Sequence, residues 1–203
     1  MKKAEIIIAT LSIIALGMNL LFIPGSGALT VLTLLILSTI YFYFGFALFN
    51  DIRLRQVLKK DSYRDISSLR ILGAVGAGLA LSSTTNGIMF QFQSWPGADF
   101  ILGAGLVGLS IVTTIGIIKY SKNKSDYYTR ILKRTVILGG LGLILMFMPK
   151  TTWIEIKYRN QPEYVEALKN AMADPENKEL WDIVERERER QRKYSGERLE
   201  SQD

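Results

Sequence analysis

"FQSWPGADF", residues 92–100, lies between two long apolar segments. A similar stretch, "FIPGSGALT", occupies residues 22–30, so that Pro24 lies 72 positions before Pro96. Proline lacks the backbone N–H and glycine permits unusual dihedral angles, so each Pro-Gly pair ends a helix and lets the chain reverse. The two stretches therefore predict two helical hairpins with their tips at a membrane surface, where Trp95 would be an interfacial anchor.

The segments around these turns are long and uncharged. No charged residue occurs between Glu5 and Asp51, and the first Pro-Gly pair divides this stretch into two helices long enough to cross a bilayer. Two further uncharged runs surround the second pair. A fifth run, residues 135–149, has 15 residues and spans only about 22 Å, so we expect Arg134 and Lys150 to snorkel at its ends. The sequence predicts five transmembrane helices, over residues 5–23, 27–49, 71–92, 98–118 and 132–149.

Composition favours the same class and narrows the chemistry. Of 203 residues, 48% are hydrophobic and the mean hydropathy is +0.17, which is unusual for a soluble domain. The chain has no cysteine and no histidine, the residues most used for metal ligation, nucleophilic attack and proton transfer at neutral pH. We therefore expect an all-α polytopic membrane protein without cofactor or metal that is not an enzyme.

The basic residues predict an orientation. The segments 50–70 and 119–134 each carry six lysines and arginines, whereas both Pro-Gly tips carry none. The positive-inside rule then places the N-terminus in the cytoplasm. Five crossings divide the chain into a transmembrane domain, residues 1–150, and an exported helical tail, residues 151–203. The alternative is a fifth helix that lies on the membrane surface and leaves the tail in the cytoplasm.

The predicted spans carry no ionisable residue in their middle. Glu5 and Asp99 lie at helix ends, where we expect water, and this argues against a proton relay. Residues 82–86 read Ser-Ser-Thr-Thr-Asn. This cluster indicates hydrogen bonds between helices, with a polar path for a solute as the alternative.

Small residues recur at four-residue spacing in the third and fourth spans. Such faces let helix backbones approach closely in lipid, either within the chain or against a partner. The candidate docking residues on these faces are Ala74, Gly78, Ser82, Ala104 and Gly108.

The tail predicts short amphipathic helices. "TWIEIKY", residues 152–158, alternates apolar and charged residues and suggests an extended segment. Pro162 begins a helix that ends at Asp174, and a second helix follows and becomes strongly charged. Their apolar faces have little to cover them within the tail, so we expect docking to a partner or to another copy of this chain. The candidate docking residues are Tyr164, Leu168, Trp181 and Val184.

One stretch resembles a known family. "MFQFQSWPGADFILGAGLVGL", residues 89–109, is similar to the Trp-Pro-Gly membrane hairpin of the inner-membrane motor subunit of Bacteroidota gliding motility and type 9 secretion. Gln91 and Ser94 stand where that family has a lysine and a histidine, and Leu109 stands near its acidic residue. The resemblance implies a Bacteroidota-like membrane protein without the motor function.

Two functions follow from these features. The first is a non-catalytic accessory or scaffold subunit of a multi-protein inner-membrane complex, with the lipid bilayer and other membrane subunits or itself as partners, and no nucleic acid. The alternative is a small-solute transporter or channel with its polar path at the Ser/Thr/Asn cluster.

Overall fold

The computed structural model describes residues 1–21, 23–57, 59–64 and 66–200. This part of the chain is all-helical and contains no strand. It divides into two compact units, an N-terminal unit, Met1–Phe147, and a C-terminal unit, Met148–Asp203. The prediction of an all-α chain is confirmed.

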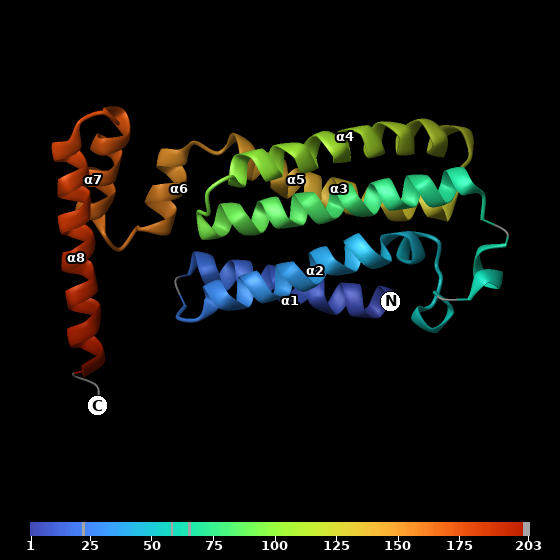
Figure 1. Ribbon diagram of the computed structural model, residues 1–203, viewed down its shortest axis with the longest axis horizontal. Helices are drawn as coiled ribbons and strands as arrows, with labels where there is room; N and C mark the ends of the chain where they lie inside the picture. The colour runs from blue at the N-terminus through green and yellow to red at the C-terminus, as the bar shows by residue number, and fades with distance from the viewer. Residues whose placement is uncertain (22, 58, 65, 201–203) are drawn as a thin grey trace. The chain divides into compact units, whose positions relative to one another are not determined.

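The N-terminal unit is a bundle of five long helices (Figure 1). Two short 3₁₀ helices, η1 and η2, lie in the loop after α2. The elements are α1 (Lys2–Leu20), α2 (Ser26–Phe49), η1 (Leu54–Gln56), η2 (Lys60–Tyr63), α3 (Ser68–Gln93), α4 (Ala98–Lys122) and α5 (Asp126–Phe147).

Each Pro-Gly pair lies in a tight turn directly before a helix. Gly25 and Gly97 both have φ of 81°, in the left-handed region that a side chain disfavours. Gly25 precedes α2 and Gly97 precedes α4, and in Figure 1 each of these helices runs back along the one before it. Trp95 is 41% exposed and its ring meets that of Phe90 edge to face, at 5.0 Å between centroids.

Helices α2, α3 and α4 pack at backbone distance because glycine removes the side chain between them. A Cβ built on Gly87 in α3 would lie 2.5 Å from the Cα of Leu102 in α4, and one on Gly105 would lie 2.5 Å from the backbone nitrogen of Thr84. Gly78 faces α2 in the same way, since its Cβ would lie 2.6 Å from the Tyr41 carbonyl oxygen. This close packing makes α3 the centre of the bundle.

Four helices of the described chain, α1 to α4, are long and apolar enough to cross a membrane. The number rises to five if α5 and α6 (Lys150–Lys157) together form one broken span. Many large apolar side chains point away from the bundle, as lipid contact requires. They include Ile13, Leu32, Tyr43, Leu72, Phe100, Ile111, Val136 and Phe147. Length and composition thus suggest a membrane protein in contact with lipid.

The fifth predicted helix needs correction. It was expected over residues 132–149, but α5 has 22 residues and begins at Asp126. The Ser125 hydroxyl accepts the Tyr127 amide at 3.3 Å, which caps the helix at this earlier point. Arg134 therefore lies inside α5 rather than at its end. The other four helices begin and end within four residues of their predicted bounds.

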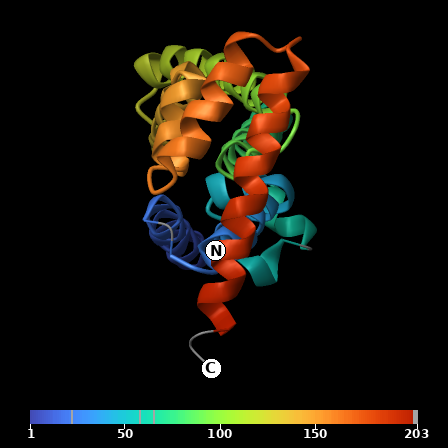
Figure 2. The same ribbon diagram turned by 90° about the vertical axis from the view of Figure 1, so that its left-hand side faces the viewer.

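The C-terminal unit contains α6, α7 (Pro162–Ala173) and α8 (Lys178–Glu200). The expectation of an extended "TWIEIKY" is wrong, because α6 begins directly after Pro149 and includes most of that stretch. A short alternating pattern is ambiguous, and here the stretch is helical up to Lys157, with Tyr158 as the C-cap. Helices α7 and α8 lie side by side and run in opposite directions (Figures 1 and 2).

Candidate functional site

A buried ion pair joins the first and last helices of the N-terminal unit. Glu5, in the first turn of α1, is 5% exposed, and its carboxylate accepts Nε and Nη2 of Arg134 from α5. Two donors of one guanidinium on one carboxylate form a fork, the strongest geometry for such a pair. The Tyr41 hydroxyl of α2 donates to the same carboxylate at 3.1 Å. Three helices thus converge on Glu5.

The neighbours of Arg134 hold its guanidinium in place. Its Nη1 donates to the Arg130 carbonyl oxygen, one turn earlier in α5, at 2.7 Å. Its guanidinium carbon lies 5.5 Å from the centre of the Phe49 ring, a cation–π contact with the end of α2. Arg130 in turn donates from Nε to the Phe49 carbonyl oxygen at 3.1 Å. These contacts fix α5 against the end of α2.

An apolar cavity of about 270 Å³ begins at this ion pair. It lies between α1 and α5 and is floored by α2 and α3. Apart from the Glu5–Arg134–Tyr41 cluster, Lys133 and Ser12, its lining consists of Ile6, Ala9, Ile13, Leu16, Leu34, Leu37, Ile88, Ile137, Leu138 and Leu141. The pair can therefore act as an electrostatic latch that holds α1 to α5 across an apolar space.

Both sequence expectations for these charges are wrong. Glu5 was expected near water and Arg134 was expected to snorkel, yet the two side chains turn toward each other inside the bundle. A buried charge is costly unless it is paired, and pairing gives each group a partner that lipid cannot supply. Asp99 is exposed as expected, and it accepts Gln91 Nε2 at 2.6 Å across the turn.

The Ser/Thr/Asn cluster of α3 makes hydrogen bonds within the bundle. Ser82 and Ser38 of α2 share a hydrogen bond of 2.8 Å between their hydroxyls, and Ser83 donates to the Ile101 carbonyl oxygen of α4 at 3.4 Å. Thr84 and Thr85 donate to carbonyl oxygens of their own helix. Every one of these four hydroxyls thus has a protein partner. Within the described chain, the Oδ1 atom of Asn86 is buried without a hydrogen-bond partner.

The predicted docking residues of the bundle lie largely inside it. Ala74, Gly78 and Ser82 are buried, so this face packs against α2 and is not available to a partner. Gly108 is half-buried, and a Cβ on it would lie 3.1 Å from the Cβ of Ala80. Ala104 is exposed and remains open to a partner.

Some predicted docking residues of the tail are packed in a core, and one is exposed. Tyr164, Ala171 and Val184 form a small core between α7 and α8, with Leu168 packed against it. The expectation that a partner must cover these faces is wrong, because the two helices cover each other. Trp181 remains 39% exposed while its indole N–H donates to the Pro175 carbonyl oxygen at 3.0 Å. Of these four predicted docking residues, Trp181 is the one whose side chain is exposed and can contact a partner.

Comparisons with known proteins give no relative. No family model, no curated protein and no solved structure matches this chain. Among the described residues, no group of three or more acidic side chains is placed to hold a metal ion.

Proposed function

We propose that this chain is a non-catalytic accessory subunit of a multi-protein complex in a bacterial inner membrane. The observation that carries the proposal is the C-terminal unit, a helical hairpin with its own core attached to an apolar bundle. A membrane protein that needed only its bundle would not require this second folded unit. The bacterial assignment rests on the resemblance of residues 89–109.

The unequal lengths of the hairpin helices support a docking role. Helix α7 has 12 residues and α8 has 23, so α8 is longer than α7 by about 16 Å at 1.5 Å per residue. Arg190, near the start of the unmatched part, pairs with Glu187 on its own helix at 3.0 Å and with Glu163 of α7 at 3.7 Å. The sequence of this part is strongly charged, and a helix that is polar all round can bridge through solvent to another domain. Trp181 and Ile183 add exposed apolar surface to the same helix.

The alternative of a transporter has less support. Its polar path was expected at residues 82–86, where all four hydroxyls have hydrogen-bond partners on α3 itself or on a neighbouring helix. Asn86 Oδ1 is the one atom of this cluster that favours a further polar contact.

The proposed topology has the N-terminus in the cytoplasm and the tail in the periplasm. It is supported by the two basic segments, 50–70 and 119–134, which adjoin the same ends of the helices as the N-terminus. Residues 150–203 have net charge −2 and residues 1–149 have +8, so the excess positive charge would stay inside. The fifth crossing of this topology requires α5 and α6 together, as one broken span.

The proposal is tested by purification of the full chain in mild detergent and mass measurement of the particle. We expect other chains to co-purify at fixed stoichiometry and the Trp181→Ala variant to lose them. Glu179→Ala, an exposed change two residues away on α8, is the control that should keep them. A full-length chain that elutes as a monomer without other proteins would overturn the proposal.

A further inference from the structure

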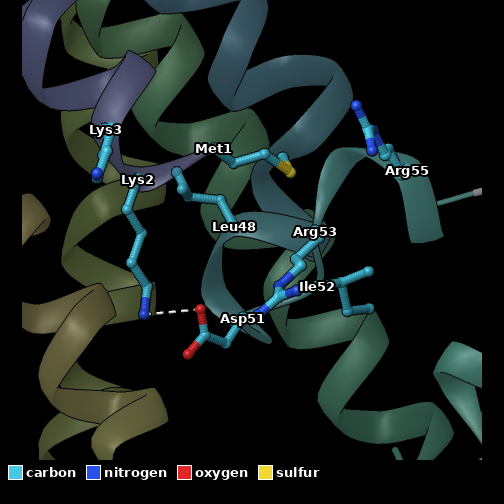
Figure 3. Close-up of a pocket in the computed structure, with 8 residues that line it drawn as sticks. All are labelled: Met1, Lys2, Lys3, Leu48, Asp51, Ile52, Arg53 and Arg55. Carbon is cyan, nitrogen blue, oxygen red and sulfur yellow. Dashed lines mark ion pairs between the residues drawn. The ribbon is translucent and has the colours of Figure 1, made fainter.

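A second cavity, of about 600 Å³, opens at the end of the bundle where α1 begins and α2 ends. Figure 3 shows Lys2 and Lys3 on α1 and the chain from Asp51 to Arg55 on the other side, with Leu48 between them. The residues that line it are Met1, Lys2, Lys3, Leu48, Asp51, Ile52, Arg53 and Arg55. Four of the eight are cationic and one is a carboxylate.

The carboxylate is already paired. Asp51 lies 2.7 Å from Lys2 Nζ and 3.9 Å from Arg130 Nη1. In the described part of the chain, no acidic side chain lies within ion-pair distance of Lys3, Arg53 or Arg55. The cavity therefore keeps an excess of positive charge around a neutralised aspartate.

The floor of the cavity is apolar. Leu48 is 1% exposed and Ile52 is 7% exposed, so both belong to the core of the bundle. The cationic side chains stand above this floor, where Lys3, Arg53 and Arg55 are exposed to solvent and Lys2 is half-buried. An apolar base with a basic rim fits a ligand that joins an anionic group to a hydrocarbon part.

The position of the cavity favours a lipid as its ligand. Helices α1 and α2 are both long enough to cross a membrane, and the cavity lies where one begins and the other ends. This is the depth of lipid headgroups in a bilayer. Basic pockets at such a level bind the headgroups of anionic lipids, because each lysine or arginine near the surface attracts the negatively charged leaflet.

We propose that this cavity binds the phosphate-bearing headgroup of an anionic phospholipid. Lys3, Arg53 and Arg55 contact the phosphate oxygens, and Leu48 and Ile52 contact the glycerol and upper acyl region. The Lys2–Asp51 pair holds the N-terminal end of α1 beside the loop after α2, so that the cationic groups come from both sides of the cavity. This role is independent of the proposed complex.

The test compares lipids added to the full chain in neutral detergent at fixed ionic strength, with the thermal unfolding temperature as readout. We expect phosphatidylglycerol to raise this temperature in a saturable manner and phosphatidylcholine to have little effect. In the Arg53→Gln/Arg55→Gln variant the shift should fall by at least half. Lys119→Gln/Lys122→Gln, which removes two exposed charges at the same end of the bundle, is the control that should keep the shift.

The outcomes decide the proposal. Equal shifts with both lipids, or a full shift in the Arg53→Gln/Arg55→Gln variant, would overturn it. A full shift with inorganic phosphate alone would show an anion site without lipid and would also overturn it. If the variant unfolds too early for this measurement, native mass spectrometry of the wild-type chain replaces it. A retained phosphatidylglycerol adduct after mild delipidation supports the proposal, and its absence contradicts it.

Discussion

Helices α3 and α4 meet in a different way from helices α1 and α5. Between α3 and α4, Gly87 and Gly105 bring the backbones together in a stretch where neither helix carries a charged residue. Between α1 and α5, one ion pair, Glu5–Arg134, bridges an apolar cavity. Lipid tails are as apolar as leucine, so helices in a membrane associate through close packing or through polar contacts. In this bundle, close packing joins the helices at the centre, and a polar contact joins the helices at the edge.

We expect the largest loss of stability when the Glu5–Arg134 ion pair is broken. In Glu5→Gln the guanidinium of Arg134 keeps its charge but loses the carboxylate, and removal of one partner from a buried pair costs about 3–5 kcal/mol. We expect the thermal unfolding temperature in detergent to fall more than for any single neutral substitution at the edge of the bundle. Scanning calorimetry or fluorescence melting measures this.

The matched variant is Glu5→Gln/Arg134→Gln, which leaves neither charge in the bundle. If the ion pair is a latch, the double variant should recover most of the stability lost by Glu5→Gln, and the double-mutant cycle gives a coupling energy. Losses that simply add would show that Glu5 and Arg134 act separately, against the latch.

The next effect should come from the close packing. Gly87→Ala places a Cβ 2.5 Å from the Cα of Leu102, so α3 and α4 must move apart, and overpacking of this kind costs about 1–3 kcal/mol. Gly76→Ala, on the same helix, is the control because a Cβ there meets nothing within 4 Å. It should be neutral or stabilising, since alanine favours a helix over glycine by about 1 kcal/mol. Equal melting temperatures for the two variants would contradict this account of the interface.

The apolar helices could be predicted from the sequence because their signals are local. An uncharged segment of sufficient length and a Pro-Gly turn define α2, α3 and α4 within four residues at each end. The fifth helix was misplaced because the basic segment 119–134 was taken as a loop, with Arg134 at the end of the span. The local signal that corrects it is Ser125 followed by Asp126, a helix N-cap with an acidic first turn.

The buried pair could not be predicted because its signal is not local. Glu5 and Arg134 are 129 positions apart, and each alone suggests a helix end near water. The C-terminal unit gave a similar error, because the apolar faces of α7 and α8 were each judged without the other. In both cases the missing information was which helices lie side by side. Asn86 was also beyond prediction. The sequence shows that it belongs to a polar cluster, but not that its Oδ1 atom is buried without a hydrogen-bond partner.

We expect the smallest effect on stability from a second ion pair of the same bundle, between Asp51 and Lys2. Asp51 and Lys2 lie at its end, with side chains 58% and 43% exposed, whereas Glu5 and Arg134 are buried. Water and salt screen an exposed pair, so it contributes little to stability. The comparison between the two ion pairs therefore predicts that the contribution of Asp51 to stability is small and is best detected by its dependence on pH.

The pKa of the Asp51 carboxyl is lowered from its ordinary value of 3.8, first by the hydrogen bond from Lys2 and then by the charges of Lys2, Arg130 and Arg53. A carboxyl with a lower pKa in the folded state stabilises that state above its ordinary pKa and loses this contribution as the pH falls through the folded value. The difference in melting temperature between wild type and Asp51→Asn should thus stay constant from about pH 7 to pH 5 and shrink below about pH 4. Asparagine suits this test because Asp51 has φ of 63°, a conformation that asparagine also tolerates. Because the buried Glu5–Arg134 pair is present in both proteins, its own response to acid cancels in the difference. A difference that grows as the pH falls would mean that the charged Asp51 destabilises the fold, and the ion pair with Lys2 would then have no stabilising role.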